Sequence, residues 1–167
     1  MWNVFVLVFS LFAAVSDVRW GKIPRGLPVL GIIVGLAFHA WRGELVSALV
    51  GSFVGFGLGL AFFRLGAIGG GDVKLITALG ALLGFQSWVI AMEAAWLLAG
   101  LIALVQVVRR RAVRQTLRNM GEILRGLRHN GLVAHPVINV RNQAMIRAPF
   151  GVAAAVGTLV AVIRPWP

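Results

Sequence analysis

Two long apolar stretches, Leu45–Phe63 and Trp88–Val108, constrain the fold of this chain more than any other feature. Each is long enough for a helix to cross the hydrocarbon core of a bilayer, which takes about 20 residues. Because every backbone N–H and C=O inside that core must find a partner within the protein, helices are expected. Four shorter apolar runs accompany them: Trp2–Ser16, Leu27–Trp41, Val73–Phe85 and Ala148–Ile163.

The composition supports the same interpretation. Hydrophobic residues make up 59% of the 167 residues, charged residues only 13%, and the mean hydropathy is +0.90, whereas a soluble domain carries about a quarter charged residues. We therefore predict an all-α polytopic membrane protein with about six transmembrane helices, built as one integral-membrane domain over residues 1–167. Because Val73–Phe85 is short for a span, we expect a loop that enters the membrane boundary to precede it. The absence of cysteine excludes disulfides and thiolate metal sites.

Basic residues are distributed unevenly over the segments between the apolar runs. Of the 16 Lys and Arg residues, 14 lie after the first run, beside the connection from the third to the fourth, or between the fifth and sixth; Arg42 and Arg164 are the exceptions. The positive-inside rule then predicts that both termini lie outside the cytoplasm. We interpret the net charge of +11 as a topology signal and expect no nucleic-acid partner.

The largest segment between apolar runs covers residues 109–147 and is predicted to be a cytoplasmic basic loop. Within it apolar residues recur at steps of four, three, four and three: Val113, Leu117, Met120, Leu124 and Leu127. Arginines occupy the other faces, so the pattern predicts a basic amphipathic helix. Such a helix is suited to lie on a membrane, and we expect residues 109–130 to bind anionic lipid headgroups. A role in docking a substrate is the alternative.

Two of the apolar runs carry small residues at every fourth position, namely Ser47, Gly51, Gly55 and Gly59 in the third run, and Gly80 and Gly84 in the fourth. Small residues on one face of a helix let a neighbouring backbone approach closely. We therefore predict that these positions are helix-packing contacts.

Two of the five acidic residues stand at the ends of apolar runs that the charge pattern places on the cytoplasmic side. Asp17 follows the first run, and Asp72 follows Gly69-Gly70-Gly71 and precedes the fourth. A carboxylate at membrane depth is costly, and Asp17 falls in the last turn of its helix, where the macrodipole disfavours negative charge. Asp72 has a structural alternative, because Asp commonly caps a helix N-terminus. The three glycines leave room for a second backbone, and the two carboxylates together indicate an aspartic protease.

The segments around both aspartates carry a family resemblance. Residues 17–24 read Asp-x-Arg-x-x-x-Ile-Pro and residues 69–74 read Gly-x-Gly-Asp-x-Lys. Together these segments resemble the type IV prepilin peptidases, which belong to the GxGD class of intramembrane aspartic proteases. The six runs and the Ala-Pro-Phe-Gly segment at 148–151 also fit.

The resemblance implies a catalytic pair and a substrate. By matching position the catalytic pair is Asp17 and Asp72, and the residues that form the loop or bind substrate are Gly69, Gly70, Gly71, Lys74 and Pro24. The implied activity is removal of the short basic leader from pilin-like precursors at the cytoplasmic face of the membrane, without a metal or other cofactor. The domain would then be an integral-membrane peptidase domain of the bacterial inner membrane.

Two departures from the family pattern narrow the resemblance. Many relatives have Ile-Pro-Asn where this chain has Ile23-Pro24-Arg25, which leaves any role of that Asn without a counterpart. Larger bifunctional relatives insert a cysteine-bearing domain between the first two spans and methylate the new N-terminus, whereas this chain has a short loop there and no cysteine. It resembles the minimal peptidases of tight-adherence (Flp) pilus systems, and no N-methyltransferase activity is expected.

Other mechanisms fit the sequence less well. The three histidines, His39, His129 and His135, lack the His-Glu-x-x-His spacing of a metalloprotease, and we interpret them as ordinary loop residues. Glu93, inside the fifth run, is interpreted as a buried hydrogen-bonding residue.

Two other classes of protein stay open. The first is a small ion- or proton-coupled transporter, in which Asp17, Asp72 and Glu93 would form a relay, although both aspartates crowd one face of the membrane. The second is a structural subunit of a secretion machine, which would not need the paired motifs.

Overall fold

The computed structural model describes residues 1–21, 23–130 and 149–164, and this part of the chain contains helices and no strand. The elements in chain order are α1 (Trp2–Trp20), α2 (Gly26–Trp41), α3 (Leu45–Arg64), α4 (Gly70–Arg109), α5 (Val113–Asn130) and α6 (Phe150–Ile163). Three of them, α1, α3 and α4, are long and apolar enough to cross a membrane, and α2 and α6 are shorter apolar helices. The prediction of an all-α polytopic membrane protein is confirmed, and the number of crossings stays a prediction.

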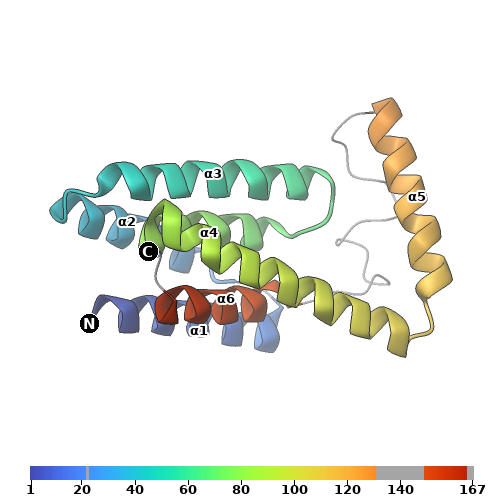
Figure 1. Cartoon of the computed structure of the whole chain (residues 1–167), viewed down its shortest axis with the longest axis horizontal. Helices are drawn as coiled ribbons and strands as arrows, with labels where there is room; N and C mark the ends of the chain where they lie inside the picture. The colour runs from blue at the N-terminus through green and yellow to red at the C-terminus, as the bar shows by residue number, and fades with distance from the viewer. Residues whose placement is uncertain (22, 131–148, 165–167) are drawn as a thin grey trace.

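Helix α4 contains the fourth and fifth apolar runs, which meet at a break rather than at a separate loop. Gly84 has φ 71 and ψ 166, a conformation that side-chain-bearing residues rarely adopt. Beyond it the second half of α4 turns back along the first (Figure 1), and the indole N–H of Trp88 donates to the carbonyl of Ile76 at 3.1 Å. The two runs therefore form an antiparallel pair within one continuous element.

Polar side chains from three other helices satisfy the backbone groups freed by this break. The carbonyl of Leu82 accepts hydrogen bonds from Trp2 Nε1 at 3.2 Å and from His39 Nε2 at 3.3 Å, and Ser47 Oγ accepts the N–H of Phe85 at 3.0 Å. The interpretation of His39 as an ordinary loop residue is therefore wrong, since it is buried in α2.

The packing of α3 on α4 follows the predicted small residues. Gly51 and Gly80 meet backbone to backbone, and a Cβ added to Gly80 would overlap the carbonyl of Gly51. Gly55 lies one turn further along α3, against Ile76, and Gly59 lies two turns further, against Val73. The prediction of packing contacts is confirmed for these four glycines, whereas Gly84 is the break in α4 itself.

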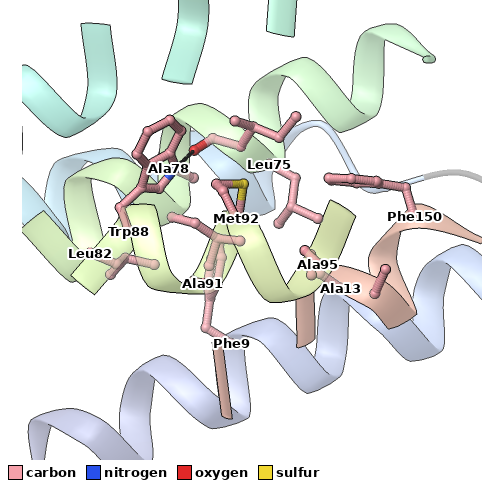
Figure 2. Close-up of a cluster of buried hydrophobic side chains, with 14 of the residues drawn as sticks. Phe9, Ala13, Leu75, Ala78, Leu82, Trp88, Ala91, Met92, Ala95 and Phe150 are labelled. Carbon is pink, nitrogen blue, oxygen red and sulfur yellow. Dashed lines mark hydrogen bonds between the residues drawn. The ribbon is translucent and has the colours of Figure 1, made fainter. Parts of the chain in front are cut away.

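The apolar core lies where both halves of α4 meet α1 and α6. Figure 2 shows Phe9 and Ala13 of α1, Leu75 and Trp88 of α4, and Phe150 of α6 converging on this region. All five side chains are buried. Because α4 supplies most of this core, it fixes the relative positions of the other helices.

The helix ends that carry the predicted motifs lie at one end of the bundle. There α1 and α3 end, α4 and α6 begin, and α5 stands clear of the other helices (Figure 1). Helix α5 confirms the predicted helix in the basic loop, and Val113, Leu117 and Met120 on its apolar face are exposed. The side chains of Leu124 and Leu127 lie outside the described residues.

The close contact of α3 with α4 predicts a sharp contrast between two glycine substitutions. Gly80→Ala should lower the free energy of unfolding by about 1–3 kcal/mol, because the added methyl group meets backbone that cannot move aside. Gly57→Ala, on the open side of α3, meets nothing within 4 Å and should leave stability unchanged or raise it by up to about 1 kcal/mol, because alanine is the better helix former. Thermal unfolding of both variants in detergent would measure the difference, and equal stability would contradict this account of the packing.

Candidate active site

Asp17 lies in the last turn of α1, as the sequence indicated. Gly21, at φ 61, ends the helix and donates its N–H to the backbone carbonyl of Asp17 at 2.9 Å. The side chain points away from α1 to the start of α6, where its Oδ2 accepts the N–H of Gly151 at 2.9 Å. The carboxylate thus meets a free N–H at a helix N-terminus, whose positive pole opposes the negative pole of α1.

No role in this site was predicted from the sequence for Gly151, the donor to Asp17. A Cβ placed on it would lie 2.8 Å from the Cβ of Asp17, 3.1 Å from its Oδ2 and 3.2 Å from the carbonyl of Ala13. A glycine is therefore required for Asp17 to approach α6 this closely. The available signal was the Pro149-Phe150-Gly151 opening of the last apolar run, but no local pattern links it to residue 17.

Asp72 caps the N-terminus of α4 while facing the same region. It is the third residue of the helix, and its Oδ2 accepts the N–H of Gly69, the N-cap residue, at 2.9 Å. This is the carboxylate half of a capping box. The structural alternative for Asp72 is thus correct in part. Among the described residues, however, capping occupies only Oδ2, and the second oxygen of each aspartate accepts no hydrogen bond.

Both aspartates line one cavity of about 1000 Å³ at this end of the bundle. Of the other residues predicted for the site, Gly69, Gly70, Gly71 and Lys74 also line it, whereas Pro24 does not. Its neighbours Ile23 and Arg25 do. The structure therefore brings the two motifs together, although they are 55 positions apart in the sequence.

One wall of this cavity is aromatic, which the sequence did not predict. Trp96 lies between Phe62 of α3 and Phe150 of α6, with ring centroids 4.6 Å and 5.6 Å apart, and all three rings line the cavity. Phe150 directly precedes Gly151, so this wall lies next to the backbone N–H that is hydrogen-bonded to the Asp17 carboxylate. The cavity can therefore accept an apolar segment next to the carboxylates.

Two cations complete the lining. Arg25, the N-cap residue of α2, and Lys74, in the second turn of α4, both face the cavity. Neither forms an ion pair with another residue in the described part of the chain. The cavity thus combines two carboxylates with two positive charges and an apolar wall.

Glu93 takes no part in the site. It is exposed on the surface of α4 and does not line the cavity, so the interpretation as a buried residue is wrong. The helix carries it on the face opposite to Ala91 and Ala95, which are the residues packed against α6. A relay through Asp17, Asp72 and Glu93 therefore has no support from this arrangement. Within residues 1–21, 23–130 and 149–164, no three side chains of metal-binding type gather.

Comparison with known proteins agrees with this geometry. The model of the type IV leader peptidase family matches residues 4–104, which include both aspartates and the glycine segment. The chain belongs to the type IV leader peptidase family. A 95-residue stretch is 37% identical to Prepilin peptidase EppA of Methanothermobacter thermautotrophicus. That match covers 50% of this chain but only 24% of the relative, and no solved structure matches the chain.

The contact between α1 and α6 predicts that Gly151→Ala separates Asp17 from its hydrogen-bond donor. Because the added methyl group would overlap Asp17, we expect the peptidase activity proposed below to fall at least about tenfold, the size of effect that a misplacement of about 1 Å can produce. The measurement is the rate of leader removal by purified protein in detergent, with KM expected to change little.

A second α6 variant controls for general damage to this helix. Gly157→Ala meets the carbonyl of Ala91 rather than Asp17, and should lower stability without a specific loss of turnover by the folded fraction. Full turnover by folded Gly151→Ala would contradict the positioning of Asp17 by Gly151.

Proposed function

We propose that this protein is a membrane-embedded aspartic endopeptidase that removes the short basic leader from type IV pilin-like precursors of the Flp type. Membership of the type IV leader peptidase family supports the class of reaction. The observation that carries the proposal is the position of Asp17 and Asp72 in one cavity, each fixed through one oxygen by the N–H of a glycine.

The chemistry requires two carboxyl groups in different protonation states. Two carboxylates that lie close together share a proton, because both do not ionise easily. The ionised group of the pair accepts a proton from water, the resulting hydroxide attacks the peptide carbonyl, and the protonated group delivers its proton to the leaving amine. Neither a metal nor another cofactor is needed for these steps.

The form of the cavity supports a peptide substrate with an apolar segment. The glycines at 69–71 carry no side chain that would block an extended backbone beside Asp72, and the wall around Trp96 suits an apolar helix. In this proposal Lys74 and Pro24 help to shape the loop or contact the substrate. The short connection from α1 to α2 and the absence of cysteine support cleavage without N-methylation.

The proposed location is the bacterial inner membrane, and the charge distribution supports an orientation with the cavity on the cytoplasmic side and both termini outside the cytoplasm. The basic face of α5 and its exposed apolar side chains suit a helix that binds anionic lipid headgroups. A basic leader would be repelled by this helix, so α5 is proposed as a membrane anchor.

The first test of the function replaces each aspartate by asparagine. Asp17→Asn and Asp72→Asn should each abolish leader removal while leaving insertion unchanged, because an amide oxygen still accepts the glycine N–H but cannot exchange a proton. Co-expression with a Flp-type prepilin, scored by its shift in electrophoretic mobility, measures cleavage. Glu44→Gln, at the opposite end of the bundle, is the matched control and should cleave normally. Processing by either Asp variant at the wild-type rate would rule out the dyad.

The second test concerns the side of the membrane that holds the cavity. A reporter that is active only in the cytoplasm should give a signal when inserted within residues 115–130 and none when fused after Pro167, since 14 of the 16 basic residues lie on the predicted inner side. The reversed pattern would place the aspartates on the outer face.

A further inference from the structure

A second cavity, of about 210 Å³, lies beside the turn between α2 and α3, at the end of the bundle opposite to the two aspartates (Figure 1). His39, in the last turn of α2, and Glu44, the N-cap residue of α3, both line it. The N–H of Glu44 donates to the backbone carbonyl of His39 at 2.8 Å. The turn therefore holds these two side chains in a fixed relation to each other.

The tautomer of His39 follows from its contact with α4. Its Nε2 lies 3.3 Å from the carbonyl oxygen of Leu82, and because a carbonyl only accepts, Nε2 carries the hydrogen. Nδ1 of the neutral ring is then an acceptor. The residue is only 6% exposed, and Nδ1 has no hydrogen-bond partner among the described residues. A histidine that binds a metal through one nitrogen commonly donates from the other to a backbone carbonyl in this way.

The atom that faces Nδ1 is also an acceptor. Glu44 Oε2 lies 3.4 Å from it, so a positive group is needed between them, and the separation distinguishes the candidates. A shared proton would draw the two atoms to about 2.7–2.9 Å. A water molecule or an ammonium group that donates to both would hold them about 4.7 Å apart, since each bond is about 2.9 Å long and the two bonds meet near the tetrahedral angle. Two ligand atoms of a tetrahedral Zn²⁺ lie about 3.3–3.5 Å apart, because each is about 2.0–2.2 Å from the ion.

We propose that His39 Nδ1 and Glu44 Oε2 are the two protein ligands of a Zn²⁺ site at this end of the bundle, which the charge pattern predicts to lie outside the cytoplasm. An imidazole with a carboxylate suits Zn²⁺ better than Mg²⁺. The other carboxylate oxygen, Oε1, accepts a hydrogen bond from Arg42 at 3.2 Å, as ligating carboxylates commonly do. Asn3 and Ser87 line the same cavity, which leaves room for water to complete the coordination.

The ion at this site is structural. It joins the turn between α2 and α3 to the ring of His39, which is hydrogen-bonded to Leu82 just before the break in α4. The cavity that contains the two aspartates is lined by neither His39 nor Glu44, so the ion has no part in hydrolysis. It therefore stabilises the folded state without changing turnover.

Equilibrium dialysis of the purified, untagged protein in detergent against Zn²⁺ tests the site. The wild-type chain should bind one Zn²⁺ in the presence of excess Mg²⁺. Glu44→Gln should weaken this binding at least about tenfold, since the loss of a group that merely supports a ligand already costs about 10–100-fold. Because the Glu44 side chain is 49% exposed, this variant should fold normally.

The matched control replaces the chain's other two histidines. His129→Gln combined with His135→Gln should bind Zn²⁺ like the wild type. No binding by the wild type, equal affinity of Glu44→Gln and the wild type, or loss of binding in the double histidine variant would each overturn the proposal.

A second measurement tests the structural role of the ion. The wild-type melting temperature should be higher in Zn²⁺ than in EDTA, because the ion binds the folded state, whereas Glu44→Gln should melt at the same temperature in both. Equal melting temperatures of the wild type in the two solutions would contradict this role. Neither measurement depends on peptidase activity.

Discussion

The need to satisfy every backbone polar group without water governs this structure. The break in α4 is where that need is greatest, because a residue with φ 71 interrupts the helix inside an apolar bundle. The side chains of Trp2 and His39 both donate to the carbonyl of Leu82. The hydroxyl oxygen of Ser47 accepts the N–H of Phe85, the first residue beyond the break. Since these side chains come from α1, α2 and α3, the break is also what ties those helices to α4. A hairpin within one element thereby becomes the centre of the fold.

The same rule explains how the two aspartates are held. The N-termini of α4 and α6 each leave N–H groups without a partner in their own helix, and Asp72 and Asp17 accept one each, from Gly69 and Gly151. The carboxylates therefore stabilise helix starts and remain oriented in the cavity through the same bond. A carboxylate used for capping is commonly considered structural, but capping needs only one of its two oxygens. The structural and the functional interpretations of Asp72 are for this reason compatible.

Much of this arrangement could be predicted from the sequence, because the deciding signals are local. Apolar runs predict the helices, and glycines at every fourth position predict the contact of α3 with α4. Two errors share one cause. The apolar surroundings of Glu93 do not show which face of α4 it occupies, and the position of His39 near the end of a run does not show that it points inward. Gly151 was missed because its function depends on Asp17, which is 134 positions away.

The surroundings of the rare acidic residues separate their roles. Glu44 lies within ion-pair distance of two neighbouring side chains at the end of the bundle away from the aspartates, where we propose a metal site, and Glu122 is exposed on the basic helix α5. Asp17 and Asp72 are the acids that share a cavity, which is the arrangement that hydrolysis by a carboxyl pair requires. Glu93 has neither an ion pair nor a cavity among the described residues. Its exposed position on α4 therefore separates it from the two acids that face the cavity.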